Sequence, residues 1–319
     1  MSEQVELEAR VPPENDGERL DQVAARLFSD YSRSRLQAWI RSGELRVNGV
    51  TLRPRDKVSA GALLEVRATI EEAVSWQPQS IELDILHEDE AIIVLNKPAG
   101  LVVHPAAGHA DGTLVNALLH HAPEMAKLPR GGIVHRLDRE TSGVMVAAKT
   151  LTAHHSLVAQ LQARTVKRQY CAFCIGVMTG GATIDAPIGR HPKQRKKMAV
   201  VVVGGKPAVT HYRVVQRFGH HTHIAVNLET GRTHQIRVHM AHRHYPLIGD
   251  PQYGGRPRIP AGASDTLIDA LRSFPRQALH AEALSLEHPD SGMELDFECP
   301  LPLDMSQLLA VLQSEDPAG

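Results

Sequence analysis

The first apolar residues along the chain recur at helical spacing. Four of them stand three or four residues apart and predict a helix with one buried face: Leu20, Val23, Ala24 and Leu27. Similar spacing resumes after a short polar break, so we expect two short helices within residues 18–42.

The next segment has the pattern of a small sheet. In LRVNGVTL, Asn48-Gly49 is a strong signal for a type I′ hairpin turn between two short strands. Residues 58–68 predict a further strand, and residues 71–80 predict a linker. We therefore expect a small first domain over residues 18–78.

From residue 79 onward the pattern changes to strands with fewer helices. Strands are predicted over residues 91–98, 143–150, 170–178, 210–217 and 223–229. Helices are predicted over residues 113–121, 156–164, 233–242 and 305–313. These elements favour a large α+β domain over residues 79–319, built on a mostly antiparallel mixed β-sheet.

Length and composition agree with two domains. The chain has 319 residues, of which 42% are hydrophobic, which suffices for sizeable cores. No apolar run reaches the ~18 residues of a transmembrane helix, and the acidic, alternating N-terminus is unlike a signal peptide. We expect a cytoplasmic protein with no membrane partner.

Cysteine and histidine patterns do not favour a metal. The three cysteines are too few for a disulfide framework. Cys171 and Cys174 spell C-x-x-C, but positions i and i+3 of a strand face opposite sides, which favours two packed thiols. A surface or RNA-facing role is the better interpretation of the neighbouring histidines His234, His239, His242 and His244.

The formal net charge is only −1, but the charges are separated along the chain. Residues 19–57 carry nine Lys/Arg against four Asp/Glu, and residues 190–197 carry five basic side chains and no acid. Residues 281–319 carry nine acids and no Lys or Arg. Such separation can create a basic face for nucleic acid, although a solvated surface run explains any single segment equally well.

Two polar segments contain candidate catalytic groups. Asp138 lies in HRLDRETSG between two apolar runs, flanked by Arg136 and Arg139, which favour its ionised form. A turn aspartate that caps local backbone amides is the competing interpretation, and the residues alone favour it. In GRTHQIRVH, Arg232 stands at a helix start and Arg237 further along it, which indicates anion binding and no more.

Residues 18–78 resemble the S4 RNA-binding domain, in which a helix pair presents basic side chains to structured RNA. The resemblance implies that the second predicted helix contacts RNA through Arg33, Arg35 and Arg41.

Five segments together resemble the pseudouridine synthases of the class that includes the large-subunit RNA enzymes. They follow the family's order and span nearly the whole chain: NKPAGLVVHP (96–105), HRLDRETSG (135–143), KRQY (167–170), GRTHQIRVH (231–239) and ALHAEALSLEHP (278–289).

The resemblance implies the chemistry of the site. Asp138 would be the catalytic carboxylate, as nucleophile or as base, with Arg232 as its ion-pair partner. Tyr170 would stack on the base and assist loss of the C5 proton. Substrate contacts are expected from Arg136, Lys149 and Ile236.

The resemblance also implies the partners. Uridine isomerisation gains and loses no atoms overall, so no cofactor and no metal are expected. The implied substrate is 23S ribosomal RNA, within it the helix 69 stem-loop, alone or in pre-50S particles. No protein partner can be predicted from the sequence.

Two other classes remain open at this point. A non-catalytic S4-type ribosome-assembly factor would bind RNA without needing Asp138 or Tyr170. A base-excising hydrolase would release free uracil instead of rejoining it to the ribose.

Overall fold

The computed structural model describes residues 3–29, 31, 33–70, 76–105, 111–194 and 197–317. The chain forms two compact units, residues 1–75 and 76–319. The sequence placed the division after residue 78 and began the first domain at residue 18, whereas the first unit includes a strand before that point. Part of the predicted linker, residues 71–75, lies outside the described residues.

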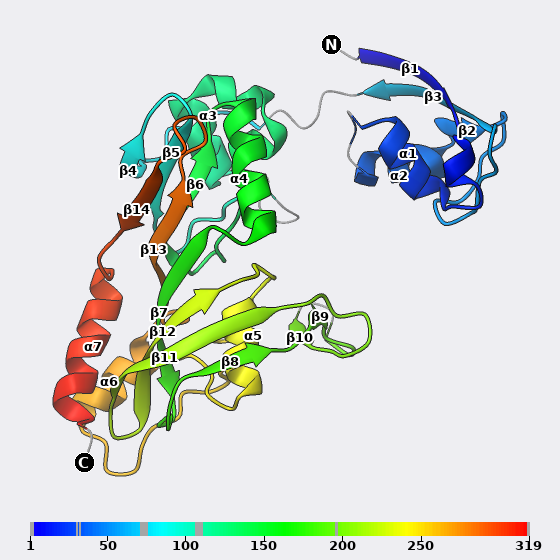
Figure 1. The fold of residues 1–319 in the computed structure, drawn as a ribbon. Helices are drawn as coiled ribbons and strands as arrows, with labels where there is room; N and C mark the ends of the chain where they lie inside the picture. Colours follow the sequence, from blue (N-terminus) through cyan, green and yellow to red (C-terminus); the bar gives the residue numbers. More distant parts are fainter. Residues whose placement is uncertain are drawn as a thin grey trace. The chain divides into compact units, whose positions relative to one another are not determined.

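The first unit combines a helix pair with a three-stranded antiparallel sheet (Figure 1). Helices α1 (Leu20–Leu27) and α2 (Arg33–Ser42) confirm the predicted pair, and a short 3-10 turn (Pro13–Asn15) precedes them. The sheet order is β1 (Glu3–Arg10), β3 (Leu63–Ile70), β2 (Leu45–Val47). The apolar faces of helices and sheet share one core.

The predicted tight turn forms, but the strand expected after it does not. Asn48 and Gly49 both have positive φ, 48° and 77°, and Val50 N donates to Val47 O at 2.9 Å. After Val50 the chain leaves the sheet, since Pro54 has no N–H to donate and Asp56 Oδ2 holds a turn at Arg53 N. Strand β2 pairs with β3 instead.

The second unit is built on a nine-stranded sheet (Figure 1). Its main order is β4 (Asp84–Glu88), β5 (Ile92–Lys97), β6 (Ser142–Ala148), β13 (Leu279–Glu287), β7 (Lys167–Ile175), β12 (His221–Leu228), β11 (Val209–Arg217) and β8 (Ala182–Asp185), with β14 (Glu294–Glu298) beside β13. Of the pairings in this sheet, β6 with β13 is parallel and the others are antiparallel. The predicted α+β class with a mostly antiparallel mixed sheet is confirmed.

Side-chain alternation gives the sheet a core on each face. Along β7, Tyr170, Ala172 and Cys174 face one core, and Cys171 and Phe173 face the other. Helices α3 (Leu114–His121) and α5 (Gln235–His242) cover the first face. Helices α4 (Leu151–Ala163), α6 (Asp265–Ser273) and α7 (Leu303–Glu315) cover the second.

Every strand and helix that the sequence predicted in this unit is present. Helix α6, strands β4, β8, β13 and β14, and a separate two-stranded hairpin were not predicted as elements. The hairpin pairs β9 (Ile188–Arg190) with β10 (Met198–Val200). The turns η2 (Pro123–Lys127) and η3 (Pro129–Gly132) precede the loop that carries Asp138. Over the part of the chain that the structure describes, no helix is both long enough and apolar enough to cross a bilayer.

Candidate active site

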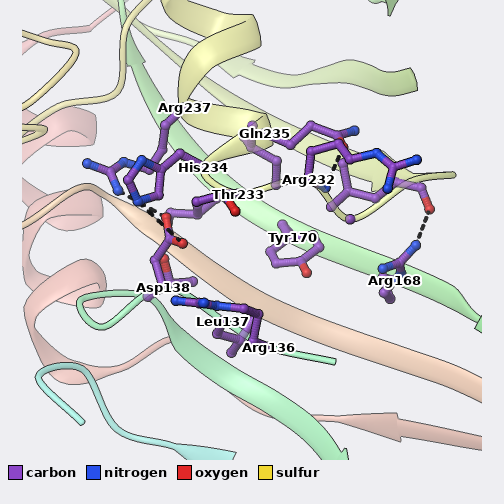
Figure 2. A pocket seen from close by; sticks show the side chains of 15 residues that line it. Arg136, Leu137, Asp138, Arg168, Tyr170, Arg232, Thr233, His234, Gln235 and Arg237 are labelled. Carbon is purple, nitrogen blue, oxygen red and sulfur yellow. Dashed lines mark hydrogen bonds and ion pairs between the residues drawn. The ribbon is translucent and has the colours of Figure 1, made fainter. Parts of the chain in front are cut away.

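Asp138 lies on the loop that joins η3 to β6, beside the first face of the sheet. The neighbouring Leu137 is buried in the core, which anchors the loop, and Asp138 O accepts the turn hydrogen bond from Thr141 N at 3.0 Å. Among the described residues the partners of the carboxylate are Arg237 and His234, not local amides (Figure 2). The interpretation of Asp138 as a turn-capping aspartate is therefore wrong.

Arg237 of α5 binds two carboxylates at once. Its Nε and Nη2 donate to Asp250 at 2.7 and 3.0 Å, and its Nη1 donates to Asp138 Oδ2 at 3.0 Å. Burial alone would lower the pKa of Arg237, but the Asp250 and Asp138 carboxylates raise it instead. The buried Asp250 also accepts from two backbone amides, so it fixes the plane of the guanidinium.

His234 approaches Asp138 from a strained backbone. Its φ of 57° is in the left-handed region, which costs a non-glycine residue about 1 kcal/mol or more. Tyr253 Oη lies 3.0 Å from Met198 N, which donates to it, and 2.8 Å from His234 Nδ1. With its own proton the phenol donates to Nδ1, which leaves Nε2–H facing Asp138 Oδ1 at 3.8 Å.

The side chain of Gln235 holds the loop that leads into α5. Its Oε1 accepts from Thr230 Oγ1 at 2.8 Å and Arg232 N at 2.9 Å. Its Nε2 donates to Val209 O and Thr210 Oγ1 at 3.0 and 2.9 Å, both on β11. This buried amide therefore ties the GRTHQ segment to the sheet and fixes the positions of His234 and Arg237.

A small pocket of about 80 Å³ opens beside Asp138. Tyr170 of β7 and Ile236 of α5 contribute to its wall, and both are buried. Burial raises the pKa of the Tyr170 phenol, with a further contribution from Asp138. The pocket is lined by Arg136, Leu137, Asp138, Thr141, Arg168, Tyr170, Leu228, Gly231, Arg232, Thr233, His234, Gln235, Ile236, Arg237 and Leu279.

Three basic side chains do not lie where they were predicted to lie. Arg232 was expected to pair with Asp138, but its Nε donates to Pro207 O at 3.0 Å at the pocket's rim, and Arg237 forms the pair. Lys149 was expected near the substrate, but it donates to Glu88 and to Asp89 O at 2.7 and 2.6 Å and does not line the pocket. Arg139 turns away and donates to Gly100 O at 3.1 Å.

Histidines and cysteines are placed mostly by packing. His239 is fully buried between Thr210 Oγ1 and Ala186 O, so the surface interpretation is wrong for it. Cys171 and Cys174 are buried on opposite faces of the sheet, as predicted. Burial raises the pKa of Cys171 to about 12. Within the described ranges, no group of three or more His, Cys, Asp or Glu side chains is arranged to hold a metal.

The arginines predicted to contact RNA from the first unit differ in their environments. Arg33 is half-exposed and pairs with the buried Asp21 at 2.7 Å. Arg41 is exposed and donates to Gln37 on the same helix. Arg35 is partly buried. Arg33 therefore stabilises the helix pair as well as contributing charge to its surface.

Sequence reasoning missed three members of the site: Arg237 as the partner of Asp138, His234, and Asp250. A signal for Arg237 was present, because a buried arginine in a helix needs a carboxylate. That carboxylate, Asp250, lies 13 residues further on and only the fold brings it near.

Comparisons with known proteins place the chain in a family. Residues 91–242 match the family model described as RNA pseudouridylate synthase, and residues 18–64 match the S4 domain. The chain is 61% identical to "Ribosomal large subunit pseudouridine synthase D" of Pseudomonas aeruginosa over 315 residues, covering 99% of this chain and 98% of the relative. It is 54% identical to the protein of the same name from Escherichia coli K12 over 316 residues, covering 99% and 97%.

A solved structure also resembles this chain. "Human RNA Pseudouridylate Synthase Domain Containing 4" superposes with a TM-score of 0.59 at 28% identity, over 74% of this chain and 95% of that one. The near-complete coverage at high identity, together with both domain matches, decides the assignment. The chain belongs to the RNA pseudouridylate synthase family, as an isomerase with an N-terminal S4 domain.

Proposed function

We propose that this enzyme converts uridine to pseudouridine in the RNA of the large ribosomal subunit, with Asp138 as its catalytic carboxylate. The observation that carries the proposal is the pairing of Asp138 with a fixed arginine beside a pocket walled by Tyr170. The names of the relatives support the large-subunit RNA as the substrate.

The reaction breaks the N1–C1′ bond of uridine, turns the base and joins C5 to C1′. The proton on C5 is lost and N1 gains one, so the atoms balance without an oxidant or a co-substrate. Asp138 would either attack C1′ or remove the C2′ proton. Each route needs a carboxylate with one oxygen free for the ribose, and Arg237 holds Oδ2 while Oδ1 faces His234 at a longer distance.

Tyr170 is suited to the base. Its ring supplies an aromatic platform beside Asp138, and uracil presents a π-face to such a surface. The raised pKa keeps its hydroxyl protonated at neutral pH, so the hydroxyl would act as a hydrogen-bonding group near C5 and not as a phenolate. The target uridine must leave its stack to enter the pocket, at a cost of a few kcal/mol.

We further propose 23S ribosomal RNA as the natural substrate and the helix 69 stem-loop as the site, in free RNA or in pre-50S particles. The sequence resemblance supports both, and with them we propose a role in ribosome biogenesis in the cytoplasm. Chemical mapping of pseudouridine in ribosomal RNA from cells that lack the protein tests this. Loss of signal in helix 69, restored by the wild-type gene, is the expected result. An unchanged map would contradict the assignment.

Asp138→Asn tests the catalytic role directly. The amide keeps the size of the side chain but cannot act as nucleophile or base, so we expect no pseudouridine while RNA binding stays within a few-fold of wild type. Purified protein and a large-subunit stem-loop suffice for both measurements. Free uracil from the wild-type enzyme would favour a base-excising hydrolase, and substantial turnover by the Asn variant would contradict the mechanism.

A further inference from the structure

A second cavity adjoins the active-site pocket and is much larger, about 520 Å³. Its wall contains Arg136, Arg168, Gly231 and Arg232, which also line the first pocket, so the two cavities are neighbours. We call it the arginine pocket. Its lining is completed by Arg130, Val134, His135, Val158, Leu161, Gln162, Arg164, Glu229 and Thr230.

The lining of the arginine pocket carries an excess of positive charge. Five guanidinium groups face one carboxylate, that of Glu229. Glu229 is already engaged by Arg164 at 2.7 Å and by His211 at 2.8 Å. The other four arginines form no ion pair with any residue that the structure describes. Like charges gathered around one cavity repel each other, and a bound anion would relieve that repulsion.

Arg168 makes the case for an anion stronger, because it is buried. Its exposed fraction is 8%, and its Nε has no acceptor among the described residues. Its Nη2 makes only long hydrogen bonds, to Leu228 O at 3.4 Å and Glu229 O at 3.3 Å. A Cβ at Gly231 would lie 2.9 Å from Arg168 Nη1, so the absence of a side chain there gives the guanidinium its room. A buried cation without a carboxylate is costly unless a ligand supplies the negative charge.

The remaining walls suggest more than a bare phosphate. Val134, Val158 and Leu161 form an apolar side, and His135 adds no charge. Burial lowers the pKa of His135 to about 3, and its Nε2 accepts a hydrogen bond from Val146 N at 3.1 Å. An apolar wall with a cationic rim matches a nucleotide, whose sugar and base are largely apolar on their faces and whose phosphate is anionic.

We propose that the arginine pocket binds the nucleotide next to the target uridine, with its phosphate held by Arg130, Arg164 and Arg168. The inference rests on the proposed function, since it takes the substrate to be an RNA strand. Arg136, Arg168 and Arg232 line both cavities, which are therefore neighbours, so one strand can place successive nucleotides in them. Binding the neighbour would fix the strand's register and help keep the target base unstacked.

The test uses Arg130→Gln and Arg164→Gln, because these two arginines line the arginine pocket and not the active-site pocket. Both residues have positive φ, 55° and 62°, and glutamine has the same backbone preferences as arginine there. The substitution therefore removes the charge without changing the backbone strain. Arg272→Gln, an exposed arginine on α6, is the matched control. Binding is measured in the Asp138→Asn background, so that the RNA is not converted.

The probe is a large-subunit stem-loop RNA with one uncharged methylphosphonate, placed in turn at each phosphate beside the target uridine. We expect each Gln variant to bind natural RNA about tenfold more weakly and the control to bind like wild type. At one of the two phosphate positions, the methylphosphonate should weaken binding by the protein with its wild-type arginines by a similar factor. At that same position, it should weaken binding by the Gln variants little further.

The proposal would be overturned if, at both phosphate positions, the methylphosphonate and the Gln substitutions weakened binding independently and additively. It would also be overturned if both Gln variants bound natural RNA with wild-type affinity. The methylphosphonate measurement on the protein with an intact arginine pocket needs no Gln variant, so it stays informative if a Gln variant folds poorly. Failure of the proposed function would look different: the wild-type enzyme would then form no pseudouridine in the stem-loop at all.

Discussion

Arg237 limits how Asp138 can act. Two of its nitrogens are committed to Asp250, which is completely buried, so the third must point where the fork's geometry dictates. Asp138 Oδ2 accepts from that nitrogen, and the carboxylate is thereby held in one orientation. At the scale of single residues, catalysis therefore depends on a pair of carboxylates that share one arginine, of which only Asp138 reaches the pocket.

Arg237→Ala should cost far more activity than Arg232→Ala. Removing a buried partner leaves Asp138 and Asp250 uncompensated, at about 3 kcal/mol or more, which is roughly 100-fold in rate. Arg232 contacts Pro207 O at the rim, so its loss should cost about tenfold or less. Single-turnover rates of pseudouridine formation measure both.

Arg237→Lys is the control for folding, because it keeps a cation beside Asp250 but loses the planar fork. Its melting temperature should be closer to that of wild type than the melting temperature of Arg237→Ala, while its rate of pseudouridine formation should still be low. A rate close to wild type for either Arg237 variant would show that the pair serves stability alone.

Tyr170→Phe separates stacking from proton transfer. The ring is retained, so RNA binding should be unchanged, while loss of the C5 proton should slow by about 100-fold. Release of tritium from RNA labelled at C5 of uridine reports that step. If tritium release from the Phe variant equalled that of wild type, the hydroxyl would have no part in the reaction.

At the scale of elements, Asp21 joins the two helices of the first unit. Its side chain is fully buried and accepts from Arg19, Arg33 and Gln37. Burial would raise the pKa of Asp21, but these three donors lower it from 3.8 to about 2. Because the folded-state pKa is the lower one, the carboxylate stabilises the unit above pH 3.8 and loses this effect as the pH falls toward 2.

Asp21→Asn should therefore destabilise the first unit by about 2 kcal/mol at pH 7. The difference from wild type should shrink between pH 4 and pH 2, the window of the shift. Urea unfolding followed by the fluorescence of the buried Trp39 measures it. A constant difference across that range would mean that the charge of Asp21 is not what stabilises the helix pair.

Elements with strong periodic patterns were predictable, and those fixed by distant partners were not. Strand β5 and helix α3 form where their apolar patterns placed them. The strand expected after Asn48-Gly49 does not form, because Pro54 and the turn held by Asp56 take the chain out of the sheet, and β2 pairs with the later strand β3 instead. Similarly, GRTHQIR contains two arginines five positions apart, and no local feature of the sequence predicts which of them pairs with Asp138. The buried Asp250 decides it.

At the scale of the whole molecule, besides residues 190–197, which carry five basic side chains and no acid, positive charge is concentrated in two places. One is the segment of residues 19–57 within the first unit, which carries nine basic and four acidic side chains. The other is the set of arginines around the active site. The second unit has cores formed entirely by its own residues. We propose that residues 1–75 dock RNA and residues 76–319 carry out the chemistry.

Deleting residues 1–75 should weaken RNA binding and site choice but leave pseudouridine formation measurable at high RNA concentration. Each phosphate contact releases counterions, so the wild-type affinity should fall by about 0.7–0.9 log units per contact for each log unit of salt. The truncated protein has fewer contacts and should show a shallower slope. Binding of both proteins to a large-subunit stem-loop at several salt concentrations gives the two slopes, and circular dichroism checks that the truncated protein is folded. Equal slopes and affinities would mean that the helix pair with Arg33, Arg35 and Arg41 does not contact RNA, and that the arginines around the active site supply the whole electrostatic attraction.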